Sequence, residues 1–179
     1  LDMLVRGEYA IERRMMLKVE GMCNGKPVSA YATNEVSVSR GLSQRMIALD
    51  ALVGGTLVDH YIADGVVLAS PTGSTAYSLS VGGPVVAPQC ACLVLSPVAP
   101  HNLPMRPVVI PSSSDVRLKV HARHAEISIA TDNETCPIPE GAEFRVRLAS
   151  RRFFLAVPHN ISFYDTLRKK MMWGVDIRS

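Results

Sequence analysis

The chain of 179 residues lacks the features that mark several large classes of protein. It has no run of about 18 apolar residues, so we expect no membrane-spanning helix. Residues 1–7 show no basic segment leading into an apolar one, so we expect no signal peptide. Because the chain does not begin with methionine, we also expect residues upstream of Leu1. The net charge is only +3, too small to predict binding to nucleic acid.

Metal-binding and disulfide patterns are missing as well. The chain has 4 cysteines, and the spacing of Cys90 and Cys92 fits neither a zinc knuckle nor a thioredoxin-type pair. Without a secretory signal we expect a cytoplasmic protein with all four thiols free, because the cytoplasm keeps thiols reduced. His121 and His124 would point to opposite faces of a strand, so we expect no metal there.

What the sequence does contain is a repeated strand pattern. Hydrophobic residues make up 47% and charged residues 20%, which is typical of a globular domain with a substantial core. Short β-branched segments alternate with turn signals such as Gly54-Gly55 and Asp64-Gly65. This favours a mainly β fold, an antiparallel β-sandwich of many short strands with one or two short helices. The expected strands are 28–38, 57–62, 65–69, 91–95, 107–110, 116–120, 126–130, 144–148 and 153–157, and the expected helices are 74–80 and 162–170.

Residues 70–80 (SPTGSTAYSLS) form the most unusual stretch, rich in hydroxyl groups directly after an apolar strand. A phosphate loop needs a Gly-Lys-Ser/Thr sequence, and no lysine follows Gly73. A nucleophile elbow needs Gly-x-Ser-x-Gly, and the second glycine is missing. What remains is a turn that starts a helix, with Thr72 or Ser74 as its N-cap. Such an end could bind an anionic or polar ligand through its N–H groups, or it could be a plain capped turn.

Polar and acidic residues upstream of this stretch favour the ligand interpretation. Asn34 and Glu35 interrupt an apolar strand, where an amide and a carboxylate need either internal partners or a ligand. A carboxylate can accept hydrogen bonds from both hydroxyls of a ribose, and an amide can recognise the edge of a base. Asp64 follows at a turn just before the hydroxyl-rich stretch. Tyr77 adds a flat ring with a polar tip.

Taken in order, these motifs resemble the NAD kinase family. The resemblance covers nearly the whole chain and includes two further blocks downstream. The matching segments are 34–35, 64–65, 70–84, 95–103 (LSPVAPHNL), 106–107, 163–168 (FYDTLR) and 173–174. The part of the family that they match is the C-terminal NAD-binding domain.

The resemblance implies a function and a two-domain plan. Members of the family phosphorylate the 2′-hydroxyl of the adenosine ribose of NAD, using ATP or polyphosphate with a divalent metal, Mg or Mn. They have an N-terminal α/β domain followed by the β-sandwich, and they form homodimers or homotetramers in which a neighbour helps to complete the site. Here residues 1–160 would be the sandwich, and residues 161–179 a helical tail returning to the N-terminal domain. The implied dinucleotide contacts are Asn34, Glu35, Arg45, Ile62, Asp64, Thr75, Ala76, Tyr77, Ser78, Leu79, Ser80 and Glu134.

The sequence also departs from the family. The Gly-Gly-Asp-Gly motif, whose aspartate is the expected general base, does not occur in these residues, so we expect this chain alone to bind NAD with little or no catalysis. Residues 131–134 stand where the bacterial pattern has Asp-Gly-Gln, and Glu134 would bring negative charge near an anionic ligand. Two alternatives remain. One is the C-terminal domain of a diacylglycerol- or sphingosine-type lipid kinase, which would need an apolar cleft; the other is a non-catalytic nucleotide-binding or oligomerisation module.

Overall fold

The structure is a computed structural model that describes residues 2–23, 25–41, 45–121, 126–132 and 134–172. It divides into two compact units. One consists of residues 14–153, and the other of residues 1–13 together with 154–179. The second unit contains α1 (Asp2–Val5) and α3 (Phe163–Met171), and the ends of two long strands run into it.

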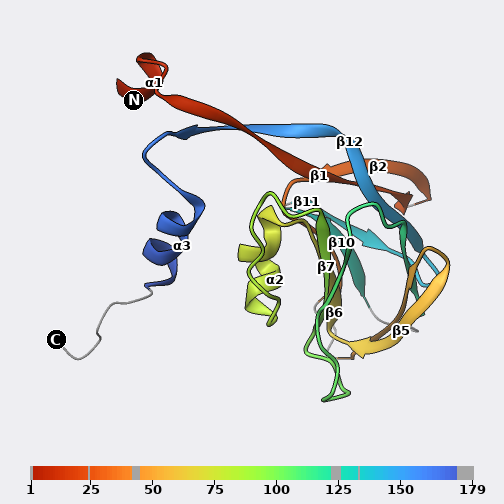
Figure 1. The fold of residues 1–179 in the computed structure, drawn as a ribbon. Coiled ribbons are helices and arrows are strands. Elements are labelled where there is room, and N and C mark those ends of the chain that lie inside the picture. Colours follow the sequence, from red (N-terminus) through yellow and green to blue (C-terminus); the bar gives the residue numbers. More distant parts are fainter. Residues whose placement is uncertain (1, 24, 42–44, 122–125, 133, 173–179) are drawn as a thin grey trace. The chain divides into compact units, whose positions relative to one another are not determined.

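Residues 14–153 form two six-stranded sheets whose strand pairs are antiparallel. The first sheet has the order β2-β1-β12-β9-β4-β5, made of β1 (Tyr9–Cys23), β2 (Lys26–Ala32), β4 (Ile47–Val53), β5 (Thr56–Ala63), β9 (Val116–Val120) and β12 (Glu143–Pro158). The second has the order β11-β10-β3-β6-β7-β8, made of β3 (Glu35–Arg40), β6 (Gly65–Ala69), β7 (Cys92–Val98), β8 (Val108–Pro111), β10 (Ile127–Thr131) and β11 (Glu134–Ile138). The predicted mainly β, sandwich-like fold is confirmed (Figure 1).

One hydrophobic core lies between the sheets. Leu17, Leu49 and Phe144 reach it from the first sheet, and Val36 and Leu68 from the second. Alternate residues of these strands point inward, because successive side chains of a strand point to opposite faces. Burying each large side chain stabilises the fold by about 1.5–3 kcal/mol.

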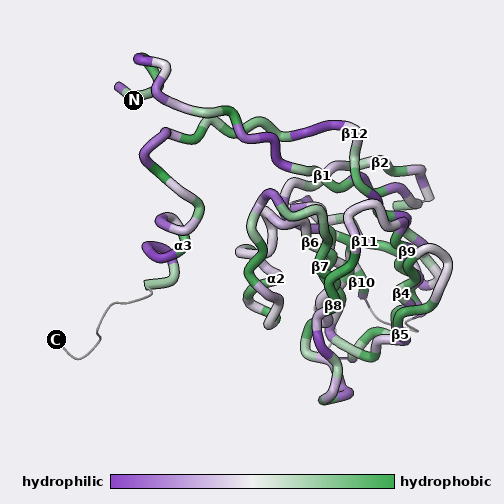
Figure 2. Tube along the Cα trace, in the orientation of Figure 1, coloured by the Kyte–Doolittle hydropathy of each residue, from purple (hydrophilic) through white to green (hydrophobic). Residues whose placement is uncertain are grey.

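Strand β6 is buried on both faces, which explains its uninterrupted apolar sequence. Val66 and Leu68 belong to the core, whereas Val67 and Ala69 pack with Val94 in a second cluster on the other side of the sheet. Figure 2 shows β6 and β7 as hydrophobic segments. The short helix α2 (Tyr77–Ser80) contacts β6, so it helps to cover this sheet.

Several strands differ from the sequence prediction. The expected strand 28–38 is two strands, β2 and β3, separated at Thr33 and Asn34. The expected strands 144–148 and 153–157 are one continuous strand, β12. Strands β1, β4 and β11 were not predicted. The break between β2 and β3 matters most, because there the backbone N–H groups of two predicted site residues, Asn34 and Glu35, donate to a side chain instead of to a neighbouring strand.

The helix predicted at residues 74–80 is wrong in its extent and its cap. A 3₁₀ turn, η1, covers Thr72–Thr75, and α2 has only four residues. Neither has a side-chain cap, so Thr72 and Ser74 are not N-caps. The helix predicted near the C-terminus is observed as α3, and Ser162 and Asp165 form a capping box at its start. Within the residues that the structure describes, no helix is long and apolar enough to span a membrane.

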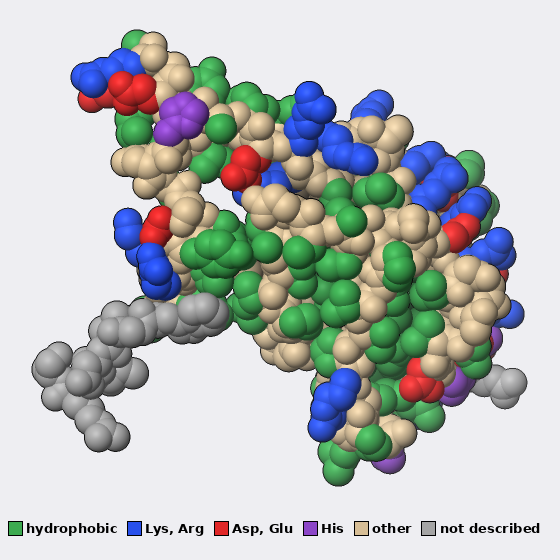
Figure 3. Space-filling model, viewed as in Figure 1, with side chains coloured by type: hydrophobic (Ala, Val, Ile, Leu, Met, Phe, Trp, Pro, Cys, Tyr) green, Lys and Arg blue, Asp and Glu red, His purple; other side chains and the backbone are tan. Residues whose placement is uncertain are grey.

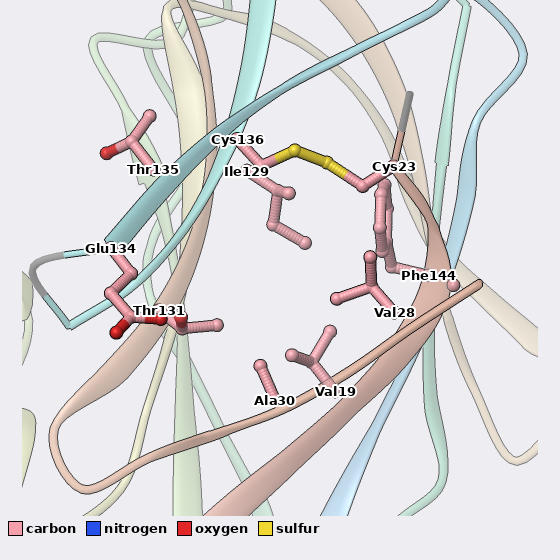
Figure 4. A pocket seen from close by; sticks show the side chains of 11 residues that line it. Val19, Cys23, Val28, Ala30, Ile129, Thr131, Glu134, Thr135, Cys136 and Phe144 are labelled. Carbon is pink, nitrogen blue, oxygen red and sulfur yellow. A yellow bond between two sulfur atoms is a disulfide. The ribbon is translucent and has the colours of Figure 1, made fainter. Parts of the chain in front are cut away.

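The prediction of four free thiols is wrong for two of them. Cys23 on β1 and Cys136 on β11 form a disulfide that links the two sheets (Figure 4). Cys90 and Cys92 are free. The pairing could not be found from spacing, because 113 residues separate the two partners and only the packing of the sheets brings them together.

We expect reduction of this disulfide to lower the free energy of unfolding by about 2–4 kcal/mol, because it releases a long loop in the unfolded chain. The measurement is urea unfolding with and without reductant. Thiol titration of the oxidised, denatured chain should detect only Cys90 and Cys92. A Cys90→Ser variant serves as the control, since it leaves the cross-link intact. Four reactive thiols before reduction would contradict the disulfide.

Candidate functional site

The site is built around the break between β2 and β3. There the backbone N–H groups of Thr33, Asn34 and Glu35 all donate to the carboxylate of Asp132, over 2.8, 2.9 and 3.0 Å. The N–H of Asp132 in turn donates to the carbonyl oxygen of Glu35. One aspartate thus satisfies three donors that a continuous strand would have placed in the sheet.

The same segment is held from its other side by the residues after β6. The N–H of Ser70 donates to the carbonyl oxygen of Asn34 over 2.8 Å, and the Ser70 hydroxyl donates to that of Thr33 over 2.6 Å. Gly73 lies directly against the backbone of Asn34, where there is no room for a side chain. The Thr33–Glu35 segment is therefore fixed between the β10–β11 turn and the η1 turn.

The hydroxyl-rich stretch divides into an inner and an outer set. Ser70, Ser74 and Ser78 are fully buried and serve internal hydrogen bonds. Ser74 donates to carbonyl oxygens and accepts from the N–H of Val86, and Ser78 bonds to Ser96. Among the predicted contacts, Thr75, Tyr77 and Ser80 are exposed, whereas Ala76 and Leu79 are half-buried. The inner serines hold the fold, and a ligand can reach only the outer set.

Among the predicted contacts, Glu35 has the carboxyl group whose surroundings are most typical of a ligand site. Its Oε2 atom is buried and has no hydrogen-bond partner in the described part of the chain. The pKa of this carboxyl group is raised to about 7, chiefly by burial and secondly by the negative charge of Asp132. The N–H of Tyr77 donates to the carboxylate and acts in the opposite direction. A buried carboxylate oxygen without a partner costs free energy unless a ligand donates to it.

Tyr77 lies beside the Glu35 carboxylate, whereas Asp64 precedes β6 at the opposite end of the β3–β6 strand pair. Burial raises the pKa of the Tyr77 phenol, and the charges of Asp64 and Glu35 raise it further. Asp64 is also paired with Arg40, with distances of 2.6 and 3.1 Å between their side chains. Because the negative charges of Asp64 and Glu35 both act on the phenol, this position suits a hydroxyl-bearing group better than a phosphate.

The structure does not place every predicted residue beside Glu35. Ile62 lies on β5 in the first sheet and is 47% exposed. Arg45 is exposed just before β4. Glu134 begins β11, and its side chain lines a cavity between the sheets. These three residues and Asp64 stay predicted contacts, whereas Asn34, Glu35 and Tyr77 lie together.

The cavity beside Glu134 has a volume of about 140 Å³ and a mostly apolar lining (Figure 4). Val19, Val28 and Phe144 point into it, and the disulfide closes one side. Ligand sites for larger molecules measure roughly 300–1,000 Å³, so this cavity is too small for a dinucleotide. Over residues 14–153, Figure 3 shows hydrophobic side chains in the middle of the visible face and Lys and Arg mostly along its margin.

The described residues offer no cluster of metal-binding side chains. Within the described ranges, no group of three or more His, Cys, Asp or Glu side chains could hold a metal ion. We therefore assign no metal ligand to these residues.

Sequence reasoning missed the residues that hold the site in place. Asp132, Ser70 and Gly73 contact the backbone of residues 33–35 rather than a ligand. Arg40 was missed in the same way, as the partner of Asp64. The available signal was the position of Asp132 just after the expected strand 126–130, and such a signal does not reveal a partner 97 or more residues away.

Comparisons with known proteins agree with these features. The family described as the ATP-NAD kinase C-terminal domain matches residues 33–158. An NAD kinase of Bacteroides fragilis is 37% identical over 180 residues, covering 99% of this chain and 61% of that protein. An NAD kinase of Heliobacterium modesticaldum is 42% identical over 176 residues, covering 97% of this chain and 62% of that protein.

Two solved structures have the same fold. A yeast NADH kinase complexed with NADH has a TM-score of 0.88 at 25% identity, with 99% of this chain and 53% of that chain covered. An NAD kinase from Archaeoglobus fulgidus in complex with ATP has a TM-score of 0.76 at 25% identity, with 96% of this chain and 63% of that chain covered. This chain spans about three fifths of the length of the curated relatives.

Proposed function

Since this chain belongs to the ATP-NAD kinase family, we propose that the whole protein is an NAD kinase. It transfers a phosphoryl group from ATP to the 2′-hydroxyl of the adenosine ribose of NAD and forms NADP. The residues of this chain form the part that binds NAD. The 179 residues hold no Gly-Gly-Asp-Gly motif, so we place the general base in a part of the protein outside this chain.

The observation that carries the proposal is the buried, unpartnered Oε2 atom of Glu35 beside Asn34. A ribose diol would satisfy it, because two hydroxyl groups can donate to one carboxylate. The Asn34 amide, on the adjacent residue, can pair with the edge of adenine. The outer residues Thr75, Tyr77 and Ser80 add exposed hydroxyl groups from the stretch after β6. This polar, acidic cluster does not provide the apolar cleft that a lipid would require.

Phosphoryl transfer depends on positioning and on stabilisation of negative charge. The NAD-binding part contributes by fixing the adenosine ribose, so that its 2′-hydroxyl is presented in one orientation. Any divalent metal would arrive with the phosphates of ATP, because the described residues include no group of three or more side chains that could hold a metal ion by themselves. We therefore expect this chain alone to bind NAD and to form little or no NADP.

Assembly and location complete the proposal. We propose a homodimer or homotetramer in which Arg45 and Ile62 contact the NAD of a neighbouring copy, since both are exposed and lie apart from the Glu35 cluster in the fold. The cytoplasmic location stays a prediction. The redox state of Cys23 and Cys136 in cells tests this predicted location, because the cytoplasm keeps most thiols reduced.

Calorimetric titration with NAD tests the proposal. We expect saturable binding that weakens roughly tenfold or more in Asn34→Ala, which loses hydrogen bonds to the ligand. Asn102→Ala is the matched control, because Asn102 is exposed in a loop after β7 and should leave the affinity unchanged. A parallel titration uses a sphingosine analogue in detergent. Lipid binding in place of NAD binding would contradict the proposal and favour a lipid kinase.

A further inference from the structure

Asp132 occupies an unusual position for a turn residue. It lies between β10 and β11 with φ of 51°, a left-handed conformation that aspartate and asparagine tolerate better than most residues. Asx turns normally bond the side chain to the backbone two residues on. Here the carboxylate instead accepts the N–H groups of three consecutive residues from a distant segment.

Those three residues include the two that the proposed function assigns to NAD. An aspartate is suited to this task, because its two oxygens offer about four acceptor positions in one plane. Oδ1 accepts from Asn34 and Glu35, and Oδ2 accepts from Thr33. The bond from the Asp132 N–H to the Glu35 carbonyl closes the arrangement in the opposite direction. The backbone of the segment can then take only one orientation relative to β10.

We propose that Asp132 is a positioning residue for the dinucleotide site, and that its carboxylate fixes the backbone of Thr33–Glu35 so that Asn34 and Glu35 face the ligand. This inference rests on the proposed function. Asp132 itself need not touch NAD.

Because Asp132 is charged, it also affects the pKa of Glu35, which an uncharged structural contact would not do. It lies close enough to Glu35 to raise the pKa of that carboxyl group. Among the described residues, the Tyr77 phenol also lies beside Glu35, and the charge of Asp64, which pairs with Arg40, acts on that phenol as well. Removal of the Asp132 charge should therefore lower the pKa of Glu35, although burial still keeps it above the ordinary value.

The experiment compares Asp132→Asn with the wild type by NMR. The asparagine keeps the shape and the left-handed conformation, but it loses the charge and one acceptor oxygen. We expect amide hydrogen exchange at residues 33–35 to accelerate roughly tenfold, since each lost bond to a charged group is worth at least that factor. We also expect the pKa of Glu35 to fall below 7, and NAD binding to weaken even at pH 8. Asp115→Asn is the matched control, because Asp115 pairs with Arg145 on the outer surface.

A second variant keeps the test decisive. Asp132→Glu retains the charge and displaces it by one methylene, so it should loosen the amides while the pKa of Glu35 stays raised. Unchanged exchange and an unchanged Glu35 pKa in Asp132→Asn would overturn the inference, and so would failure of both variants to fold. If the wild type does not bind NAD, the proposed function fails, but the exchange and pKa measurements still decide whether Asp132 holds this segment.

Discussion

Replacement of Gly73 by alanine is expected to destabilise the fold by about 3 kcal/mol and to abolish NAD binding. A Cβ atom at this position would lie 2.7 Å from the Cα of Asn34 and still closer to its carbonyl carbon and oxygen. All three are backbone atoms, so no flexible side chain can move away. The η1 turn or the Thr33–Glu35 segment must shift, and either shift breaks the bonds from Ser70 that hold the segment.

Urea unfolding and NAD calorimetry measure the two parts of this expectation. Gly55→Ala is the control, because Gly55 lies in the β4–β5 hairpin with φ of 83° and has no atom within 4 Å of its ideal Cβ. That variant should lose about 1 kcal/mol through backbone strain and retain NAD binding. Wild-type stability and affinity in Gly73→Ala would show that the close approach does not constrain the site.

Replacement of Glu35 by glutamine is expected to weaken NAD binding and to stabilise the fold at the same time. The neutral amide loses a charge-assisted interaction with the ribose hydroxyls, which should weaken binding roughly 10- to 150-fold above pH 7. Because the wild-type carboxylate must ionise to bind best, its affinity should increase as the pH rises through about 7. The affinity of the variant should not change over that range.

The stability effect has the opposite sign. The pKa of Glu35 is about 7 in the folded chain against an ordinary value of 4.5. The wild type therefore has its full stability below pH 4.5 and loses part of it as the pH rises through 7, because the buried carboxyl must then carry a charge. The glutamine variant does not have this loss. After allowance for partial solvent exposure, it should gain roughly 1–2 kcal/mol over the wild type at pH 8 and nothing near pH 4.

Thermal unfolding at pH 5 and pH 8, with calorimetry over the same range, separates these effects. Glu143→Gln provides the control, because Glu143 is exposed and pairs with Arg117 at the surface. Its stability should change by less than about 1 kcal/mol at either pH. A glutamine variant at position 35 that binds NAD as tightly as the wild type would remove Glu35 from the site.

The fold class could be predicted because it depends on local patterns. Alternation of apolar and polar residues, with turn residues between them, was enough to predict an antiparallel sandwich, and the helix expected at residues 162–170 corresponds to α3. Strand boundaries were harder. Residues 28–38 read as one strand because Tyr31, Val36 and Val38 suit a strand equally well on both sides of the break. Nothing local shows that Asp132 withdraws three N–H groups from the sheet there.

The candidate site was partly predictable for the same reason. Asn34 and Glu35 stood out as a polar pair in an apolar segment, and the hydroxyl-rich stretch stood out from its surroundings. The roles of the serines were not predictable, since a buried Ser78 and an exposed Ser80 look alike in a sequence. Their burial depends on which side of α2 faces β6.

By itself, the sequence determined the mainly β architecture, the family resemblance and the polar residues able to bind a dinucleotide. These follow from side-chain type and spacing along the chain. Only the tertiary structure decided that Asp132 and Gly73 hold the Asn34–Glu35 segment, that Glu35 carries an unpartnered buried oxygen, and that Cys23 bonds to Cys136. Each of these depends on groups far apart in sequence, and their distances are set by the packing of two sheets rather than by any local preference.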